Sequence, residues 1–200
     1  MPLAAVRAGD VAFLISVSGA AVPGAETTID HARNEMTAGG MRQDMVERIA
    51  GLMALQYEYA RTGQGWDEYL AMREELGAGR SPDTFPDTPD HPYWQVVRRL
   101  YFSDPGPTLR RLRTPTLALF GALDNNILPE KNRAAWEAAL KAGGNPDYTL
   151  RILPRANHLQ FEAKAGHNAE TLSLQRIVPD YFTTIRDWLA TRVEGFRGAR

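Results

Sequence analysis

The sequence predicts an α/β protein with a short parallel sheet of about three strands, flanked by helices and interrupted by a helical insertion. Strands are predicted by three short runs of aliphatic, aromatic and β-branched residues, Val11–Ser16, Thr116–Phe120 and Tyr148–Leu153. Such continuous apolar runs are typical of strands buried on both faces, as in a parallel sheet. A helical pattern separates the second and third runs and another follows the third, and this order implies right-handed crossovers.

The long segment between the first and second strands has the patterns of helices. Four helices are expected within it, at about residues 26–36, 43–61, 66–76 and 93–102. Apolar residues recur there at helical spacing, and a proline-rich stretch at 77–92 interrupts them. Thr27 or Thr28 is expected to cap the first of these helices. We therefore assign residues 26–102 to a helical insertion, and residues 1–25 and 103–200 to one α/β core.

Helices beside the strands are predicted from their end signals. Pro129 suits the first turn of a helix that reaches about residue 142, and Gly143-Gly144 suits its end. A final helix is expected at about 179–193, because apolar residues recur there at helical spacing. Residues 2–8 look like the last turns of another helix.

The composition excludes several classes of protein. Lys and Arg total 23 against 24 Asp and Glu, so the net charge of −1 excludes a strongly basic nucleic-acid binder. With no Cys, the chain has no disulfide, zinc–thiolate site or catalytic thiol. No apolar run approaches the roughly 18 residues of a membrane span. No glycine-rich phosphate-binding motif occurs, and the N-terminus is a poor signal peptide. We expect no cofactor, no metal, no nucleic-acid or membrane partner, and a cytoplasmic location.

Two polar residues follow the carboxyl ends of predicted strands. Asp124 comes after the second strand and His158 after the third. Because ligands of open α/β sheets gather at this edge, we expect the two side chains to lie close together. A carboxylate beside an imidazole fixes its tautomer and stabilises its cation, so the imidazole can act as a general base. The order of acid and then His is that of the α/β-hydrolase triad.

Structural roles compete with these interpretations. Asp124 could cap the following helix or close a turn, and His158 could be a loop residue bonded to backbone. His31 and Glu35 lie one helical turn apart, which is more typical of a solvated face than of a metal site. The acidic loop of Asp83, Asp87, Asp90 and His91 lacks the close spacing of a calcium site.

Four segments carry a resemblance to a known family. Residues 115–124 (PTLALFGALD) and 153–158 (LPRANH) are similar to an acid-bearing strand with its loop and to a His loop. Residues 104–115 and 14–21 are similar to the approach to that strand and to the strand after a nucleophile helix. Together they resemble the α/β-hydrolase superfamily, on its prolyl-oligopeptidase and dienelactone-hydrolase side. The resemblance implies that Asp124 and His158 are catalytic and that the helical insertion is lid-like.

The nucleophile of that family is missing from the pattern. None of the serines lies in a Gly-x-Ser-x-Gly elbow; they are Ser16, Ser18, Ser81, Ser103 and Ser173. Gly79-Arg80-Ser81 has half the pattern, in the proline-rich loop. Since only ten residues precede the first strand, we expect the chain to begin inside the nucleophile helix and to lack the elbow half.

The resemblance implies a serine hydrolase acting on an ester, thioester or peptide bond of a small-molecule or peptide substrate. Without a nucleophile, we expect these residues alone to be inactive. The alternatives are a non-catalytic interaction module or half of a two-chain assembly. The apolar strand at Val11–Ser16 has no Pro, Lys or bulge signal to protect an edge. We therefore expect a homodimer through that edge, or docking there of the missing N-terminal half.

Overall fold

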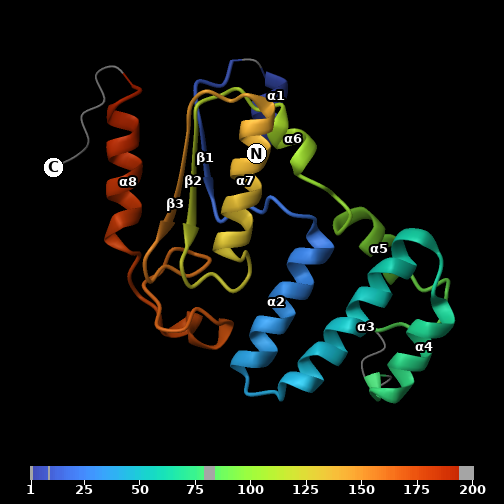
Figure 1. The fold of residues 1–200 in the computed structure, drawn as a ribbon. Coiled ribbons are helices and arrows are strands. Elements are labelled where there is room, and N and C mark those ends of the chain that lie inside the picture. The colour runs from blue at the N-terminus through green and yellow to red at the C-terminus, as the bar shows by residue number, and fades with distance from the viewer. Residues whose placement is uncertain (1, 9, 79–83, 194–200) are drawn as a thin grey trace. The chain divides into compact units, whose positions relative to one another are not determined.

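The computed structural model describes residues 2–8, 10–78 and 84–193. The chain divides into two compact units: residues 1–22 with 105–200, and residues 23–104. The first unit is α/β and the second is helical (Figure 1). These boundaries differ by a few residues from the core and insertion ranges expected from the sequence.

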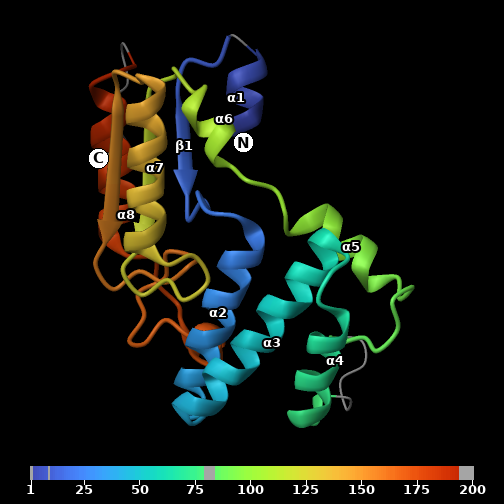
Figure 2. The ribbon, with the colours of Figure 1, turned by 45° about the vertical axis from the view of Figure 1, so that its right-hand side comes forward.

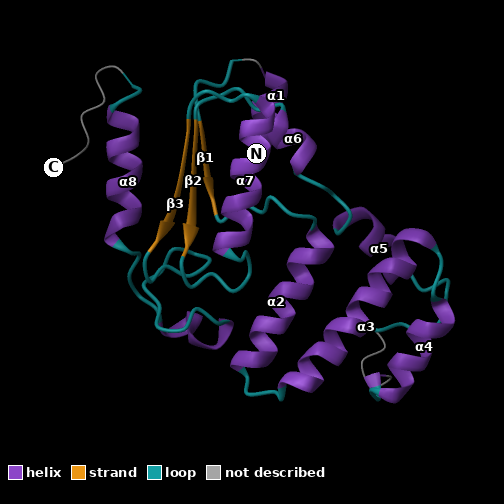
Figure 3. Cartoon of the chain, viewed as in Figure 1, coloured by secondary structure: helices purple, strands orange, loops and turns teal. Residues whose placement is uncertain are grey.

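The α/β unit is built on a parallel sheet in the order β1-β2-β3 (Figure 3). The strands are β1 (Leu14–Val17), β2 (Thr116–Gly121) and β3 (Tyr148–Leu153). Leu14 pairs with Thr116, which pairs with Tyr148, so all three carboxyl ends lie at one edge of the sheet. The α/β class with about three parallel strands is therefore confirmed.

Helices cover both faces of the sheet. They are α1 (Pro2–Ala8), α6 (Gly106–Arg110), α7 (Pro129–Gly143) and α8 (Pro179–Ala190). The 3-10 helix η2 (Asn168–Ser173) lies in the segment between β3 and α8. In β2, Ala118 and Phe120 pack in a cluster with α7, whereas Leu117 and Leu119 pack in a cluster with Trp188 of α8. Alternate side chains thus enter opposite layers, and α7 and α8 lie on opposite faces (Figures 1 and 2). This burial on both faces explains why β2 is a continuous apolar run.

The first strand is shorter and later than expected. β1 spans Leu14–Val17, not Val11–Ser16, because its ladder begins where Leu14 N donates to Pro115 O at 2.8 Å. Val11 and Phe13 pack on the two sides of the sheet without joining the ladder. The expected burial of this run on both faces was also wrong, because only Leu14 is buried, Ala12 is exposed and the other residues of the run are partly exposed. The pairing with β2 sets the length of the ladder.

The helical unit contains four described α-helices: α2 (Gly24–Ala38), α3 (Gln43–Thr62), α4 (Trp66–Glu75) and α5 (Tyr93–Leu100). Its core is a cluster of aromatic rings around the fully buried Tyr69 and Trp94, whose centroids are 5.7 Å apart. The expected cap at Thr27 or Thr28 was wrong. Pro23 precedes α2, and Thr28 lies inside the helix, where its hydroxyl donates to Gly24 O at 2.8 Å.

Candidate active site at the carboxyl edge of the sheet

Asp124 is held rigidly in the turn after β2. Its carboxylate is buried, and Oδ1 accepts hydrogen bonds from the backbone N–H groups of Asn126 at 2.9 Å and Ile127 at 2.8 Å. Asp124 N donates to Gly121 O at 3.1 Å, which closes the turn. Asp124 therefore does close a turn, as one of the structural interpretations expected. Only Oδ1 takes part in that turn, so Oδ2 is available to another donor.

His158 meets that carboxylate from the loop after β3. Its Nδ1 lies 3.0 Å from Asp124 Oδ2 and 3.2 Å from Oδ1. The imidazole side chain is 34% exposed, whereas the Asp124 side chain has no exposed surface. The spatial pairing expected from the strand order is thus confirmed. With Nδ1–H donated to the carboxylate, Nε2 keeps its lone pair and can accept a proton.

The loop that carries His158 is tied to β1 through Ser18. The Ser18 hydroxyl donates to His158 O at 2.8 Å and accepts a hydrogen bond from Gln160 Nε2 at 3.0 Å. Ser18 and Gln160 are both buried, and both have positive φ values, of 48° and 65°. Residues other than Gly adopt this backbone conformation at a cost, and such strain clusters at functional sites.

Asn157 adds a second constraint on the same loop. Its buried Oδ1 accepts from Leu159 N and Phe161 N, each at 3.0 Å, and its backbone N donates to Phe161 O at 3.0 Å. The backbone on both sides of His158 is therefore fixed, so the imidazole is presented by a rigid turn.

The acid and His loops touch at Gly121. A Cβ built on Gly121 would lie 2.4 Å from Ala156 O and 2.5 Å from Asn157 O. Ala122 N donates to Leu153 O at 2.9 Å, and Leu123 N donates to Ala156 O at 2.8 Å, across the same contact. Only a residue without a side chain permits this approach, which brings Asp124 and His158 within reach.

Sequence reasoning missed the roles of Ser18, Asn157 and Gln160. The sequence presents Ser18 only as a candidate nucleophile, and its polar position after an apolar strand is the one signal of its role. Nothing in the sequence marks Gln160, because its role depends on a contact with Ser18 that is 142 positions away.

The serines do not form a nucleophile elbow in the part of the chain that the structure describes. The hydroxyl of Ser18 donates to His158 O, and that of Ser173 donates to Glu170 O at 2.7 Å. Ser16 lies within β1, and Ser103 is exposed in the helical unit. Ser81, with its half-matching Gly79-Arg80 context, lies outside the described residues.

Over residues 2–8, 10–78 and 84–193, no group of three or more His, Cys, Asp or Glu side chains is placed to hold a metal ion. His31 and Glu35 therefore belong to no such group, and of the acidic loop Asp83 lies outside the described residues. Among the same residues, none of the helices has both the length and the apolar character that crossing a membrane requires.

Comparison with known proteins gives little sequence similarity. No protein-family model matches the chain, and no curated protein matches it. One solved structure, described as the crystal structure of esterase E22, is similar at 15% sequence identity with a TM-score of 0.40. The match covers 94% of this chain and 58% of the esterase, so the chain spans less than two thirds of that protein's length.

Proposed function

We propose that this chain carries the acid and the base of a hydrolase active site of the α/β-hydrolase class. Asp124 is the orienting acid and His158 the general base, acting on an ester, thioester or peptide bond of a small-molecule or peptide substrate. The single observation that supports this proposal best is the contact of 3.0 Å between His158 Nδ1 and the buried carboxylate of Asp124. Its position at the carboxyl edge of a parallel sheet also supports the proposal.

The hydrogen bond between Asp124 and His158 determines which atoms can take part in the reaction. Asp124 Oδ2 accepts the Nδ1–H of His158, so Nε2 removes a proton from an attacking hydroxyl. The carboxylate then stabilises the imidazolium that forms. In the second half of the step, Nε2–H protonates the leaving group, and the imidazole returns to its starting tautomer.

The attacking hydroxyl, on this proposal, comes from outside the described residues. The hydroxyls of Ser18 and Ser173 already donate to backbone carbonyls, and no serine of the sequence lies in a Gly-x-Ser-x-Gly elbow. We therefore propose that the 200 residues alone do not hydrolyse esters. The helical unit begins at Pro23, shortly after β1 ends at Val17, and this place in the chain supports its proposed role as the lid-like part.

The tautomer of His158 tests the proposal directly. Nitrogen-15 NMR of the neutral imidazole should show the proton on Nδ1 of His158. His91 is an internal reference with the opposite tautomer, because its Nδ1 accepts the backbone N–H of Tyr93 at 3.2 Å.

The variant Asp124→Asn sharpens this test. Two backbone N–H groups hold Oδ1, so the amide oxygen should take that place and the amide NH₂ should take the place of Oδ2. That NH₂ would donate to Nδ1 and move the ring proton to Nε2. A wild-type His158 protonated on Nε2, or a tautomer that Asp124→Asn leaves unchanged, would refute the assignment.

A fluorophosphonate probe and p-nitrophenyl esters test the missing nucleophile. The purified chain should neither be labelled nor turn over ester above a His158→Ala control. Labelling that disappears in Ser18→Ala or Ser81→Ala would show instead that the chain supplies its own nucleophile.

A second candidate function is one half of a two-chain assembly. It is favoured by β1, whose outer edge has no paired strand among the described residues. In that case a partner polypeptide would bring the nucleophile, and adding the partner should restore labelling by the probe.

A further inference from the structure

A cavity of about 700 Å³ lies within the α/β unit, beside the loops that carry Asp124 and His158. Its lining comes from the loop after β2, the loop after β3 and the segment that follows η2; the residues used below are Leu123, Arg155, Glu162, Lys164, Leu174 and Arg176. Neither Asp124 nor His158 lines it. The cavity is therefore a separate feature that the proposed hydrolase chemistry does not use.

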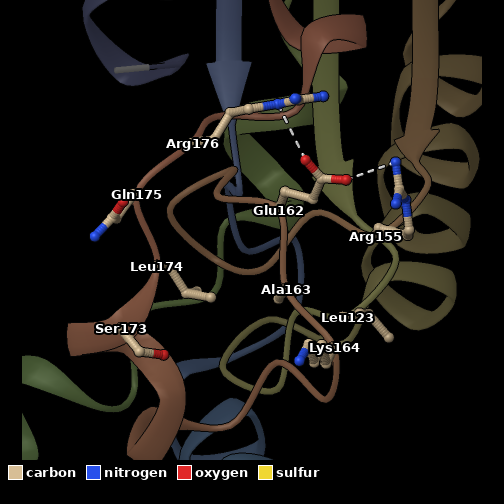
Figure 4. Close-up of a pocket in the computed structure, with 9 residues that line it drawn as sticks. All are labelled: Leu123, Arg155, Glu162, Ala163, Lys164, Ser173, Leu174, Gln175 and Arg176. Atoms are coloured by element: carbon tan, nitrogen blue, oxygen red, sulfur yellow. Dashed lines mark ion pairs between the residues drawn. The ribbon is translucent and has the colours of Figure 1, made fainter.

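Three of the lining residues form an ordered row of charges. Glu162 lies between the two guanidinium groups, with Oε1 at 2.6 Å from Arg155 Nη2 and Oε2 at 3.1 Å from Arg176 Nε (Figure 4). The Glu162 side chain is 23% exposed, whereas those of Arg155 and Arg176 are 67% and 66% exposed. The carboxylate is thus the inner member of the row, and the guanidinium groups are the accessible ones.

Backbone hydrogen bonds build this row, so it does not depend on side-chain rotamers alone. Glu162 N donates to Arg176 O at 2.7 Å on one side, and Ala163 N donates to Arg155 O at 2.8 Å on the other. Glu162 also forms an antiparallel bridge with Ala156. Three backbone segments therefore lie side by side, with Arg155 in a turn of positive φ, and they place their charged residues next to one another.

Lys164 adds a further positive charge. It lies two residues after Glu162 on the same segment and also lines the cavity. The Glu170 carboxylate accepts hydrogen bonds from the backbone N–H groups of Lys164, Ala165 and Gly166. Burial opposes ionisation of Glu170, but these donors lower the pKa of Glu170 and fix the backbone around Lys164.

The charges that line the cavity do not balance. The lining contains two guanidinium groups and one ammonium but a single carboxylate, an excess of two positive charges in a chain whose net charge is −1. Each guanidinium has five N–H donors, and an ion pair with Glu162 uses only part of that capacity. The excess charge produces a positive electrostatic field. A concave site concentrates this field and attracts anions.

We propose that this cavity binds a small organic anion whose oxyanion head group, a phosphate or a carboxylate, is held by Arg155 and Arg176. Guanidinium groups bind both head groups through paired N–H donors. Lys164 lies elsewhere on the lining and adds to the positive charge of the cavity. Leu123 and Leu174 also line the cavity and offer contact to an apolar body of the ligand. Glu162 holds the two arginines in place while the site is empty.

Isothermal titration of the full chain with phenyl phosphate tests the site, with phenylacetate, inorganic phosphate and phenol as comparison ligands. Phenyl phosphate or phenylacetate should bind at millimolar concentration or below, and whichever binds more tightly identifies the head group. Inorganic phosphate and phenol should each bind more weakly, because one lacks the apolar body and the other the charge. Equal affinity for phenyl phosphate and inorganic phosphate, with no binding of phenylacetate, would overturn the assigned ligand class.

Three variants test whether the residues of the cavity are the ones that bind the anion. Arg176→Gln should weaken binding of the tighter organic anion roughly ten-fold, the loss of one charge-assisted contact. Glu162→Gln should tighten it, because the competing internal carboxylate is neutralised while the side-chain shape is kept. Arg186→Gln on α8 is the matched control, since it removes an exposed arginine paired with Asp187 away from the cavity and should leave binding unchanged.

Two results would overturn the site. One is the absence of binding by both organic anions in the unaltered chain. The other is equal weakening by Arg176→Gln and Arg186→Gln, which would indicate a general charge effect. Neither outcome depends on whether the chain hydrolyses anything, so the test is independent of the proposed hydrolase function.

Discussion

The hydroxyl of Ser18 donates a hydrogen bond to the carbonyl oxygen of His158 at 2.8 Å, across 140 positions of sequence. Gln160 Nε2 donates to the same hydroxyl oxygen at 3.0 Å. The Ser18 hydroxyl, just after the end of β1, thus holds the backbone of the His loop. This relationship connects β1 to the loop after β3, although β2 lies between the two strands in the sheet.

Two substitutions of Ser18 should distinguish what its hydrogen bonds contribute to stability from what its backbone strain costs. Ser18→Ala removes the donor to His158 O and the acceptor of Gln160 Nε2, and should cost about 1–3 kcal/mol in the free energy of unfolding. Ser18→Gly loses the same bonds but relieves the positive φ, so its cost should be lower by about 1 kcal/mol. Hydrogen exchange of the β2 amides measures the stability of the α/β unit. Equal costs for the two variants would argue against stored strain.

Gly121→Ala should separate the acid from the base. The added methyl group would meet Ala156 O and Asn157 O at less than 3 Å, so the His loop must move away from the acid loop. We expect a clear loss of stability and loss of the Nδ1–H tautomer of His158. The control is Gly144→Ala, where a Cβ meets no atom within 4 Å and only the positive φ of 72° is strained. An unchanged His158 signal in Gly121→Ala would contradict the close-approach argument.

The outer edge of β1 should promote self-association. Leu14 N and Ser18 N donate to β2, so the alternate N–H groups of Ile15 and Val17 face away from it. Val17 is 39% exposed, and no Lys or Pro protects the strand. A second copy can pair with this edge through the same groups, so we expect light scattering to report a dimer at tens of micromolar.

The variant Val17→Pro tests which edge is used. Proline removes an N–H that β2 does not use, so the sheet should persist while pairing through the edge is lost. Val17→Thr keeps the N–H and the side-chain shape and should remain dimeric. A monomeric parent chain, or a Val17→Pro variant that stays dimeric, would rule out this interface.

The helical unit should lose stability at alkaline pH. Burial raises the pKa of Tyr93 to about 12, and burial raises those of Tyr57 and Tyr69 further. Since tyrosine in the unfolded chain ionises near pH 10, the charged form favours unfolding. The stabilisation should be complete below about pH 10 and should fall as the pH rises toward 12.

Tyrosinate absorbance followed together with circular dichroism checks this prediction. Ionisation of the cluster should coincide with loss of helix, and Tyr93→Phe should make the loss less steep because one titrating group is removed. Ionisation near pH 10 with helices intact would show that these rings are not buried as the structure places them.

The sequence by itself determined the fold class and the two residues of the candidate site. The continuous apolar run at β2 indicated burial on both faces, and this burial depends on local composition more than on details of packing. The positions of Asp124 and His158 after successive strands predicted their pairing, since parallel strands end at one edge. Helix ends with strong local signals, such as Pro129 and Gly144, also agreed with the structure.

Only the tertiary structure decided where β1 begins and what holds His158. The length of β1 depends on the register with Thr116, and the role of Ser18 depends on a carbonyl that is far away in sequence. The row formed by Arg155, Glu162 and Arg176 likewise arises from backbone pairing between separate segments. Local propensity and periodicity describe a residue's own neighbourhood, whereas these features depend on which distant groups the folded chain brings into contact.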